Sequence, residues 1–471
     1  MLVHDFWAAI NDMEAIVPNC MPRSPTTGGL RLWISLALAS LVSSGCAIYH
    51  PLPLRAESNR VSTLTVPSGT LLPGGLKTHE FDPSDGLDAT EVSMAAVVYS
   101  PELRVMRAQA MVSGAQAFAA GLLPDPVFGL SRDKPNAGQV GASVAYTRGV
   151  SWDFGQLVTY DARQSALHHT EEQVNLSVLW AEWQVVCQSR LLFVRIQQGR
   201  ALVERLRQEA DTLRPLRPRL EAALRAGTIT FDVATTGLSA ALDVERQLSE
   251  ARSSLSAAEH DLRELIGLEA TEPLSLVGDA DLAVPDDATV NAVLLETPPR
   301  RPDLRALIAG YAAQDSRVRA AILGQFPAVN FGLTKTRDNS NIASNGFTLS
   351  VSLPVFDRNQ GAVRVEQASR EQLNAEYSQR LLSTRADVAR LLDAQRILTE
   401  REASLAPYAA KVEAIAANAS AAYSRGIMDW TVYVALRQSA LAASTELISL
   451  RETLAETRIG LATLVTGEWP A

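Results

Sequence analysis

Side chains that could bind a metal or carry out catalysis are few in this chain of 471 residues, and their spacing argues against both roles. His168 and His169 are neighbours in the sequence, and successive residues of a helix point about 100° apart, so this pair cannot hold one ion together. The sequence has no nucleophile elbow, no His-Glu-x-x-His motif, no glycine-rich phosphate loop and no cysteine pair. We therefore expect no catalytic site, no metal and no cofactor, and the chain is predicted not to be an enzyme.

Lipid modification of a cysteine is the one covalent chemistry that the sequence indicates. An apolar segment, residues 32–42, follows Arg23 and Arg31 and ends in Ser43-Ser44-Gly45-Cys46. This order is typical of a bacterial lipoprotein signal, and the segment is shorter than the ~20 apolar residues that a membrane-spanning helix needs. We predict a signal peptide at residues 1–45 and an acylated Cys46 as the first mature residue. A plain cleaved signal, with Cys46 incidental, is the alternative.

The first twenty residues, the cysteines and the net charge limit the prediction further. Residues 1–20 carry acidic side chains where a signal peptide is positive, so Met21 is the predicted true start. Cys20 and Cys46 fall outside the expected soluble fold, which leaves Cys187 alone and no intramolecular disulfide. A net charge of −9 without a basic stripe argues against nucleic-acid binding.

The elements that would position a site occur twice. Residues 123–132 align with residues 326–335, and similar matches join Gly227 to Gly426 and Pro101 to Pro302, each about 200 residues apart. We interpret the chain as two copies of one unit. The predicted parts are an N-terminal anchored segment at 46–91, a first copy at 92–268, a connector at 269–300 and a second copy at 301–471.

Each copy is predicted to contain one β-hairpin. Apolar residues alternate with small polar residues around Val144 and around Leu349, and turn-forming stretches precede both strands. The predicted strands are residues 126–133, 139–154, 328–336 and 346–356. Four such strands suit a membrane barrel only if several chains pool them, because open edges are not tolerated in lipid. Two soluble hairpins with one buried face are the alternative.

Long helices are predicted around the hairpins. Residues 156–224 contain almost no glycine and would form a rod of roughly 100 Å at 1.5 Å per residue. Helices at 230–266 and 304–324 would stack end to end along this rod. In the second copy, the rod would be 362–424 and the stack 429–465 with 92–121.

Several motifs in this order resemble the TolC-type outer-membrane efflux proteins. The residues that carry the resemblance are Leu122-Leu123-Pro124-Asp125-Pro126, the turns at Gly227 and Gly426, Arg301-Pro302-Asp303-Leu304, Phe326-Pro327, and Leu353-Pro354-Val355-Phe356-Asp357-Arg358-Asn359-Gln360-Gly361. Within the last segment, the sequence from Phe356 to Gly361 is most similar to the heavy-metal-cation branch of that family.

The resemblance implies a mostly α-helical fold with a β-barrel part. A long antiparallel α-helical barrel would carry four β-strands per protomer, and a homotrimer would close a twelve-stranded transmembrane barrel. The implied partners are a periplasmic adaptor, an inner-membrane pump and outer-membrane lipid, with no nucleic acid. The implied location is the outer membrane, with a lipid anchor and the helical part in the periplasm.

The resemblance also implies two kinds of site near the helical tip. Adaptor contacts are expected at the two turns, and an acidic pore aperture is expected just beyond them, because carboxylate rings favour cations. The alternatives are purely structural roles. The glycines would cap the helices and their apolar neighbours would pack, and the two carboxylates would stabilise helix N-termini. The candidate contacts are Gly227, Thr228, Ile229, Phe231, Gly426, Ile427, Met428 and Trp430, and the aperture candidates are Asp232 and Asp429.

The predicted function is a passive outer-membrane channel of a tripartite efflux system that exports small solutes, metal cations or drugs. Two alternatives stay open at this point. A periplasmic coiled-coil lipoprotein would bury the apolar hairpin faces against protein, and a type I protein-secretion duct would use the same fold for a larger cargo.

Overall fold

The computed structural model describes residues 49–54, 64–67, 72, 76, 79–136, 141, 143–278 and 301–465. The predicted signal peptide at 1–45, the predicted anchor Cys46 and most of the predicted connector lie outside these residues. Residues 49–54 belong to a separate unit, Met1–Asn59, and are exposed, without helix or strand. The sections below concern the unit Arg60–Ala471.

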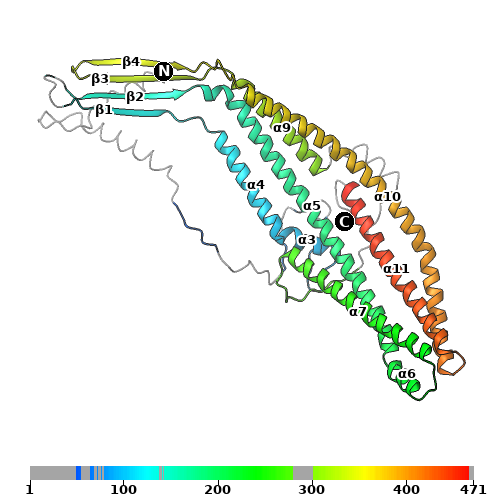
Figure 1. Ribbon diagram of the computed structural model, residues 1–471. Helices are drawn as coiled ribbons and strands as arrows, with labels where there is room; N and C mark the ends of the chain where they lie inside the picture. Colours follow the sequence, from blue (N-terminus) through cyan, green and yellow to red (C-terminus); the bar gives the residue numbers. More distant parts are fainter. Residues whose placement is uncertain are drawn as a thin grey trace. The chain divides into compact units, whose positions relative to one another are not determined.

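Most described residues of this unit are helical (Figure 1). No helix in the described part of the chain has both the length and the apolar character to cross a membrane. The helices are α3 (Ala89–Tyr99), α4 (Pro101–Ala120), α5 (Gly155–Leu213), α6 (Leu216–Arg225), α7 (Phe231–Ile266), α9 (Pro302–Leu323), α10 (Gln360–Ser424) and α11 (Trp430–Val465).

Two of the predicted helices are interrupted. The rod expected at 156–224 is wrong in its continuity, because it ends at Leu213 and resumes as α6 after Pro215. Proline has no amide hydrogen and collides with the carbonyl one turn earlier, so a helix often breaks there. The helix expected at 92–121 is divided at Ser100, whose hydroxyl accepts from the Leu103 amide at 3.4 Å and caps α4.

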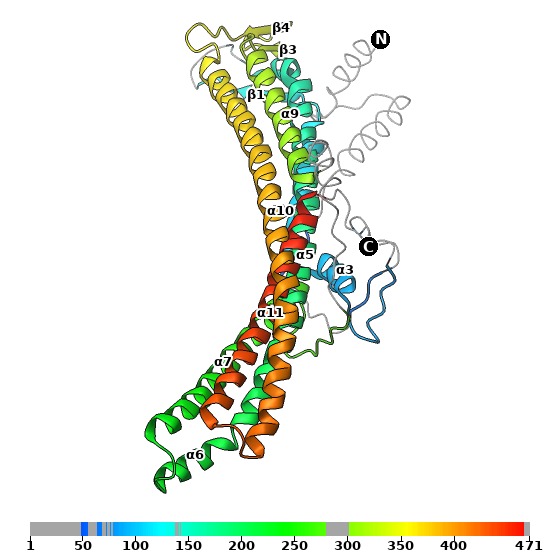
Figure 2. The same cartoon turned by 90° about the vertical axis from the view of Figure 1, so that its right-hand side faces the viewer.

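The long helix α5 holds the helical part together. Both α7 and α9 pack along it, which confirms the predicted stack of two shorter helices on one rod. In the second copy α11 packs on α10 as predicted, and α9 also contacts α10 (Figure 2). Residues 92–121, which we expected to extend the stack along α10, pack on α5 instead.

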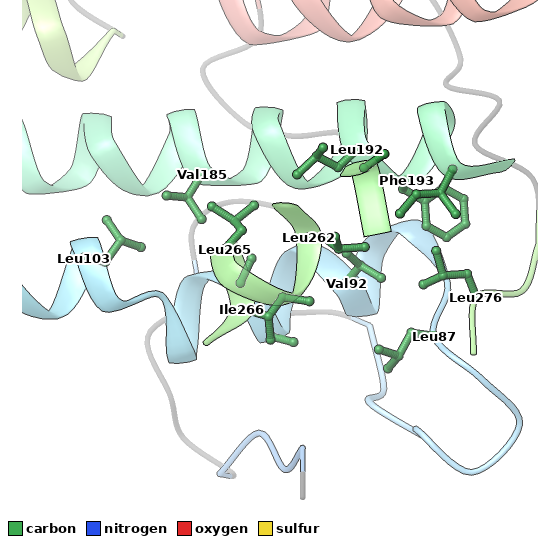
Figure 3. Close-up of a cluster of buried hydrophobic side chains, with 14 of the residues drawn as sticks. Leu87, Val92, Leu103, Val185, Leu192, Phe193, Leu262, Leu265, Ile266 and Leu276 are labelled. Carbon is green, nitrogen blue, oxygen red and sulfur yellow. The ribbon is translucent and has the colours of Figure 1, made fainter. Parts of the chain in front are cut away.

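The largest buried cluster lies where α3, α4 and α7 meet the middle of α5 (Figure 3). Phe193 of α5, Leu262 of α7 and Leu103 of α4 are fully buried within it. Burial of a Leu or Phe side chain contributes roughly 1.5–3 kcal/mol each. The cluster therefore fixes the start of α4 against the end of α7. Its other labelled members are Leu87, Val92, Val185, Leu192, Leu265, Ile266 and Leu276.

The four predicted strands are confirmed, and they form one antiparallel sheet in the order β1-β2-β3-β4. Three ends differ from the prediction by more than one residue: β2 begins at Ala145 instead of 139, β4 ends at Val351 instead of 356, and β4 begins at Ala343 instead of 346. Pro354 explains the second difference, because it cannot donate to a strand ladder. The strands are β1 (Val127–Asp133), β2 (Ala145–Asp153), β3 (Val329–Arg337) and β4 (Ala343–Val351).

Candidate functional site

The sheet has one apolar face. The register places Trp152, Phe331 and Leu349 in one row across β2, β3 and β4, and Val150, Leu333 and Phe347 in the next row. Large side chains on this face are exposed: Phe347 has 74% of its surface exposed and Leu349 58%. Nothing in the described part of the chain covers them, so this face needs an apolar environment outside the chain.

The opposite face is small and polar. The register joins Gly129, Gly149, Thr334 and Gly346 in one row, and the next row pairs the hydroxyls of Thr336 and Ser344 at 2.8 Å. A methyl group at Gly149 would lie 2.8 Å from the Leu333 carbonyl oxygen, so the close approach of two strands requires this glycine. Hydroxyls on such a face can face water without cost.

Both edges of the sheet are open within the described chain, because β1 and β4 each pair with only one strand. Half of the amides and carbonyls of an edge strand point away from the sheet and require another partner. Water satisfies them outside a membrane, but hydrocarbon does not. The sheet is therefore incomplete in an apolar environment unless another strand is added at each edge.

The opposite end of the helical part is a tip formed by two helix turns, α6 to α7 and α10 to α11 (Figure 1). Gly227 and Gly426 end the preceding helices with left-handed φ angles of 69° and 74°. The Thr228 amide donates to Ala223 O and the Ile427 amide to Ala422 O, both at 3.0 Å. This is the Schellman cap, and glycine adopts its left-handed conformation without a steric penalty.

An aromatic cluster fills the space between the two turns. The rings of Tyr423 and Tyr433 are stacked with centroids 4.8 Å apart, and Trp430 lies 5.4 Å from Tyr423. Gly237 of α7 allows the contact, because a methyl group there would come within 2.7 Å of the Trp430 ring and of Leu220. The turns are thus held together by a packed core at the tip.

The structure divides the eight candidate contacts into two groups. Trp430 is buried, and Ile229 and Met428 are half-buried against the same aromatic cluster. These three side chains therefore pack, as the purely structural alternative expects. The remaining candidates are exposed, with 72% of Phe231 and 74% of Ile427 accessible. The exposed set is Gly227, Thr228, Phe231, Gly426 and Ile427.

The two aperture candidates occupy helix N-termini. Asp429 precedes α11 and accepts from the Thr431 amide at 2.8 Å, while Asp232 lies in the first turn of α7. Hydrogen bonds lower the pKa of both carboxyls, from Thr431 for Asp429 and from Thr230 for Asp232. Both side chains are exposed and therefore negatively charged at neutral pH, which is compatible with helix stabilisation and with an acidic ring in an assembly.

A buried charge network that we did not predict ties α5 to the second copy above the tip. Glu209 of α5, only 1% exposed, accepts from Arg437 of α11, with Nε to Oε1 at 3.0 Å, and from Arg205 at 3.3 Å. Arg205 also donates to Glu413 of α10 at 3.0 Å. Burial alone lowers the pKa of Arg437, but the Glu209 carboxylate outweighs it and raises that pKa. Sequence periodicity could not find this pair, because 228 residues separate Glu209 from Arg437.

The Arg-Pro-Asp-Leu motif forms a second buried network. Arg301 binds Asp303 through two hydrogen bonds of 2.9 and 2.7 Å, and its guanidinium lies 5.1 Å from the ring centre of Trp180 on α5. Arg380 of α10 donates to the same carboxylate at 2.9 Å. Burial acts to raise the pKa of Asp303, but the two arginines outweigh it and hold that pKa below its ordinary value. The motif therefore joins the start of α9 to both long helices.

Among the described residues, one His-Asp-Glu group has the spacing of metal ligands: His79, Asp88 and Glu91. Its carboxylates already serve the start of α3. Asp88 accepts from the amides of Thr90 and Glu91, and Glu91 accepts from the Asp82 and Asp88 amides. Nε2 of His79 lies 3.1 Å from the remaining Asp88 oxygen. The group is a capping box with a histidine neighbour.

Comparison with known proteins agrees with this architecture. Residues 296–467 match the family model of outer membrane efflux proteins. No curated protein sequence matches the chain.

Solved channel structures share the fold over most of its length. CusC is 16% identical, with a TM-score of 0.67 over 87% of this chain and 99% of that chain. The CmeC outer-membrane channel of Campylobacter jejuni is 14% identical, with a TM-score of 0.69 over 90% of this chain and 94% of that chain. The open state of the Neisseria gonorrhoeae MtrE outer-membrane channel is 16% identical, with a TM-score of 0.65 over 89% of this chain and 97% of that chain. The second half of the chain is thus similar to the outer membrane efflux proteins, and the chain has the fold of the TolC-type outer-membrane channels.

Proposed function

We propose that three copies of this chain form a passive channel across the outer membrane. The observation that carries the proposal is the four-stranded sheet with one apolar face, one hydroxyl-rich face and two open edges. An unpaired backbone group in hydrocarbon costs several kcal/mol, so pairing β4 of one copy with β1 of the next removes the penalty. Twelve strands then enclose the polar face as a water-filled path.

Exposed apolar residues on the helices support association of several copies. Met111 and Phe118 of α4 are 77% and 73% exposed, and Leu382 and Ile397 of α10 are 69% and 60% exposed. Large apolar side chains in such numbers on two helices favour contact with another protein surface. A trimer would let α4 and α10 of neighbouring copies cover each other along the helical part.

The proposed partners are a periplasmic adaptor and an inner-membrane pump, because nothing in a passive channel supplies energy. We assign adaptor contact to the exposed part of the tip, especially Phe231 and Ile427. The buried Trp430 would support these residues from behind. Asp232 and Asp429 would form negatively charged rings where solute enters, which favours cations.

The exported solute is proposed to be small, and the segment from Phe356 to Gly361 favours metal cations through its resemblance to the heavy-metal-cation branch. This segment also has a local role. Arg358 and Asn359 adopt left-handed φ angles of 48° and 55°, and the Asn359 amide group donates to Ala321 O at 2.8 Å. Gly361 follows within the first turn of α10 without a left-handed φ, so Arg358 and Asn359 make the bend.

Two alternative functions are tested by specific features. A coiled-coil lipoprotein without a pore would bury the apolar hairpin faces against protein, whereas Phe347 and Leu349 are exposed. A type I secretion duct would share every feature described above. Growth assays of a deletion strain separate the classes: loss of zinc, cobalt or copper tolerance supports metal export, drug sensitivity alone supports drug export, and loss of a secreted protein supports the duct.

The channel is tested by placing one charge on either face of β4. Leu349→Arg should impair insertion, because an arginine facing lipid near mid-membrane costs about 2–4 kcal/mol. Ser350→Arg, on the polar face, should assemble normally and alter conductance. The measurements are trimer yield in outer-membrane fractions and single-channel recording. Equal insertion of the two variants would remove the main support for the channel.

The lipid anchor is proposed at Cys46, which would tie the mature N-terminus to the outer membrane. Each buried CH₂ of an acyl chain contributes about 0.8 kcal/mol of membrane attachment. Mass spectrometry of the mature protein should find a lipid-modified cysteine at this position. An unmodified N-terminus at Ala47 or later would refute the anchor without affecting the channel.

A further inference from the structure

A pocket of about 570 Å³ lies where four helices leave the sheet. The helix α4 leads into β1, α5 follows β2, α9 leads into β3 and α10 follows β4, so all four leave the same end of the antiparallel sheet (Figure 1). Helix α4 packs on α5, α5 on α9 and α9 on α10, which makes one layer in the order of the strands. Because residues of all four helices line the pocket, it lies on the concave side of this layer.

The walls of the pocket are mostly small and apolar. Each of the four helices contributes alanine side chains, which leave the space open. The alanines are Ala119, Ala120, Ala166, Ala320, Ala321 and Ala362. Leu122 and Leu167 add two larger apolar side chains. The volume falls within the ~300–1,000 Å³ that is typical of small-molecule sites, so the pocket can hold the apolar body of such a molecule.

Two arginines line the same pocket, Arg163 of α5 and Arg317 of α9. The Arg163 guanidinium donates to Gln156 O at 2.7 Å. The Arg317 guanidinium donates to Gln314 Oε1 at 3.2 Å and to Thr170 Oγ1 at 3.0 Å. These acceptors are neutral, so they hold the two guanidiniums in place without cancelling their charges. An arginine has five N–H donors, and most of those on this pair stay available to a ligand.

One carboxylate, Glu366 of α10, also lines the pocket. It accepts from the side-chain amide of Gln314, whose oxygen accepts from Arg317. The buried Gln314 therefore bridges the carboxylate and the guanidinium, which do not bond to each other directly. Two cations and one anion are the charged side chains that line the pocket, so its net charge is positive.

We propose that this pocket binds an organic anion with an apolar body, such as an aromatic carboxylate. Guanidinium groups match carboxylate oxygens in charge and geometry, and hydrogen bonds between ionised groups are among the stronger ones in proteins. The alanine-lined walls would hold the rest of the molecule. The two arginines would repel a bare metal cation, and an inorganic anion would leave the apolar walls without a contact. The site lies within one copy of the chain, so it goes beyond the proposed channel and does not depend on it.

Equilibrium dialysis with the purified full-length protein in detergent tests the site. The probes are 2-naphthoate, the neutral alcohol 2-naphthylmethanol and the cation 2-naphthylmethylammonium, and a detergent blank corrects for uptake by micelles. The unchanged protein should bind the acid about ten-fold more tightly than the alcohol, or better, and the ammonium ion more weakly than the alcohol. Arg163→Gln with Arg317→Gln should reduce binding of the acid to the level of the alcohol. Both arginines are exposed, so this variant should keep the helical fold, which circular dichroism checks.

A second variant and a matched control separate the pocket from a general effect of charge. Ala362→Phe places a ring in the pocket at an exposed position of α10 and keeps both arginines, so it should abolish binding of the acid and of the alcohol alike. The control is Arg207→Gln with Arg319→Gln, which removes one exposed arginine each from α5 and α9 outside the pocket. This control should bind all three probes like the unchanged protein.

Equal binding of the acid and the alcohol by the unchanged protein would overturn the proposal, and so would tighter binding of the ammonium ion. A pocket variant that keeps the preference for the acid, or a control that loses it, would place binding elsewhere and overturn it too. Conductance of the same preparations in planar bilayers reports on the channel separately, because its absence in the unchanged protein would refute the channel alone.

Discussion

The two helix turns of the tip share a backbone conformation and differ in what their side chains do. Gly227 and Gly426 both end a helix with the same left-handed cap and the same 3.0 Å hydrogen bond from the following amide. After the second turn Trp430 is buried in the aromatic cluster, whereas after the first turn Phe231 is 72% exposed. The two turns therefore have the same backbone conformation and different roles. The second turn packs the tip together, and the first presents an exposed apolar side chain.

The starts of α4 and α9 differ in the same way. Both begin with proline, but Ser100 caps α4 with its hydroxyl, and Arg301 precedes α9 with a buried guanidinium. Glu102, at the position equivalent to Asp303, is exposed. The second copy therefore joins its helices through buried charge, and the first relies on the apolar cluster around Phe193.

The largest expected effect in this comparison comes from the buried charge. Asp303→Asn should destabilise the helical part by about 3–5 kcal/mol, because Arg301 would stay buried without its anion. Glu102→Gln, the equivalent exposed change, should stay within about 0.5 kcal/mol. Urea unfolding followed by circular dichroism measures both. Similar losses for the two variants would remove the distinction between the copies.

The pH dependence of that stability follows from the lowered pKa of Asp303. A carboxyl whose folded pKa is below its ordinary value of 3.8 contributes stability above pH 3.8, and the contribution disappears as pH falls through the lower folded value. The difference in melting temperature between the unchanged protein and Asp303→Asn should therefore be constant near neutral pH and shrink below about pH 4. A difference that persists at pH 2 would assign the loss to packing instead of charge.

The next effect concerns the aromatic tip. Trp430→Ala should lower the free energy of unfolding by about 3–5 kcal/mol, because it removes a buried ring that packs beside the stacked rings of Tyr423 and Tyr433. Phe231→Ala should barely change stability and should weaken adaptor binding, measured by surface plasmon resonance with the purified adaptor. An adaptor affinity that is unchanged by Phe231→Ala would argue that this turn is only a connection.

A smaller and equal effect is expected at the two caps. Gly227→Ala and Gly426→Ala should each lower the free energy of unfolding by about 1 kcal/mol. Nothing crowds either site, so only the left-handed backbone disfavours alanine. Gly361→Ala is the matched control of opposite sign: it lies in α10 with open space around it and should stabilise by about 0.5–1 kcal/mol. Unequal effects at the two caps would show that the turns differ in backbone as well.

The smallest expected effect on stability belongs to Asp232 and Asp429. Their lowered pKa values keep both charged well below neutral pH. Replacing both with Asn should reduce the cation preference of the channel, read as a reversal potential closer to zero in a salt gradient. Asp125→Asn, a change before β1 at the other end of α5, is the control. An unchanged reversal potential would leave only the helix-capping role.

The sequence predicts the helices and strands better than it predicts the ion pairs that join them. Period-two alternation and the scarcity of glycine identified the four strands and the long helices, because both signals are local. The break at Pro215 and the end of β4 before Pro354 were missed, although proline is a local signal that could have revealed them. The Glu209–Arg437 and Asp303–Arg380 pairs join distant segments, and no periodicity encodes such contacts.

The orientation of β4 tests the central claim most directly. Ser350→Cys and Leu349→Cys would be made singly in the full chain, reconstituted in planar bilayers and treated with a charged thiol reagent that cannot cross lipid. Burial raises the pKa of the Cys187 thiol, which keeps that native cysteine unreactive. We expect modification to reduce the single-channel conductance of Ser350→Cys and leave that of Leu349→Cys unchanged. A block at position 349 but not at 350, or no conductance from either, would contradict the proposed channel.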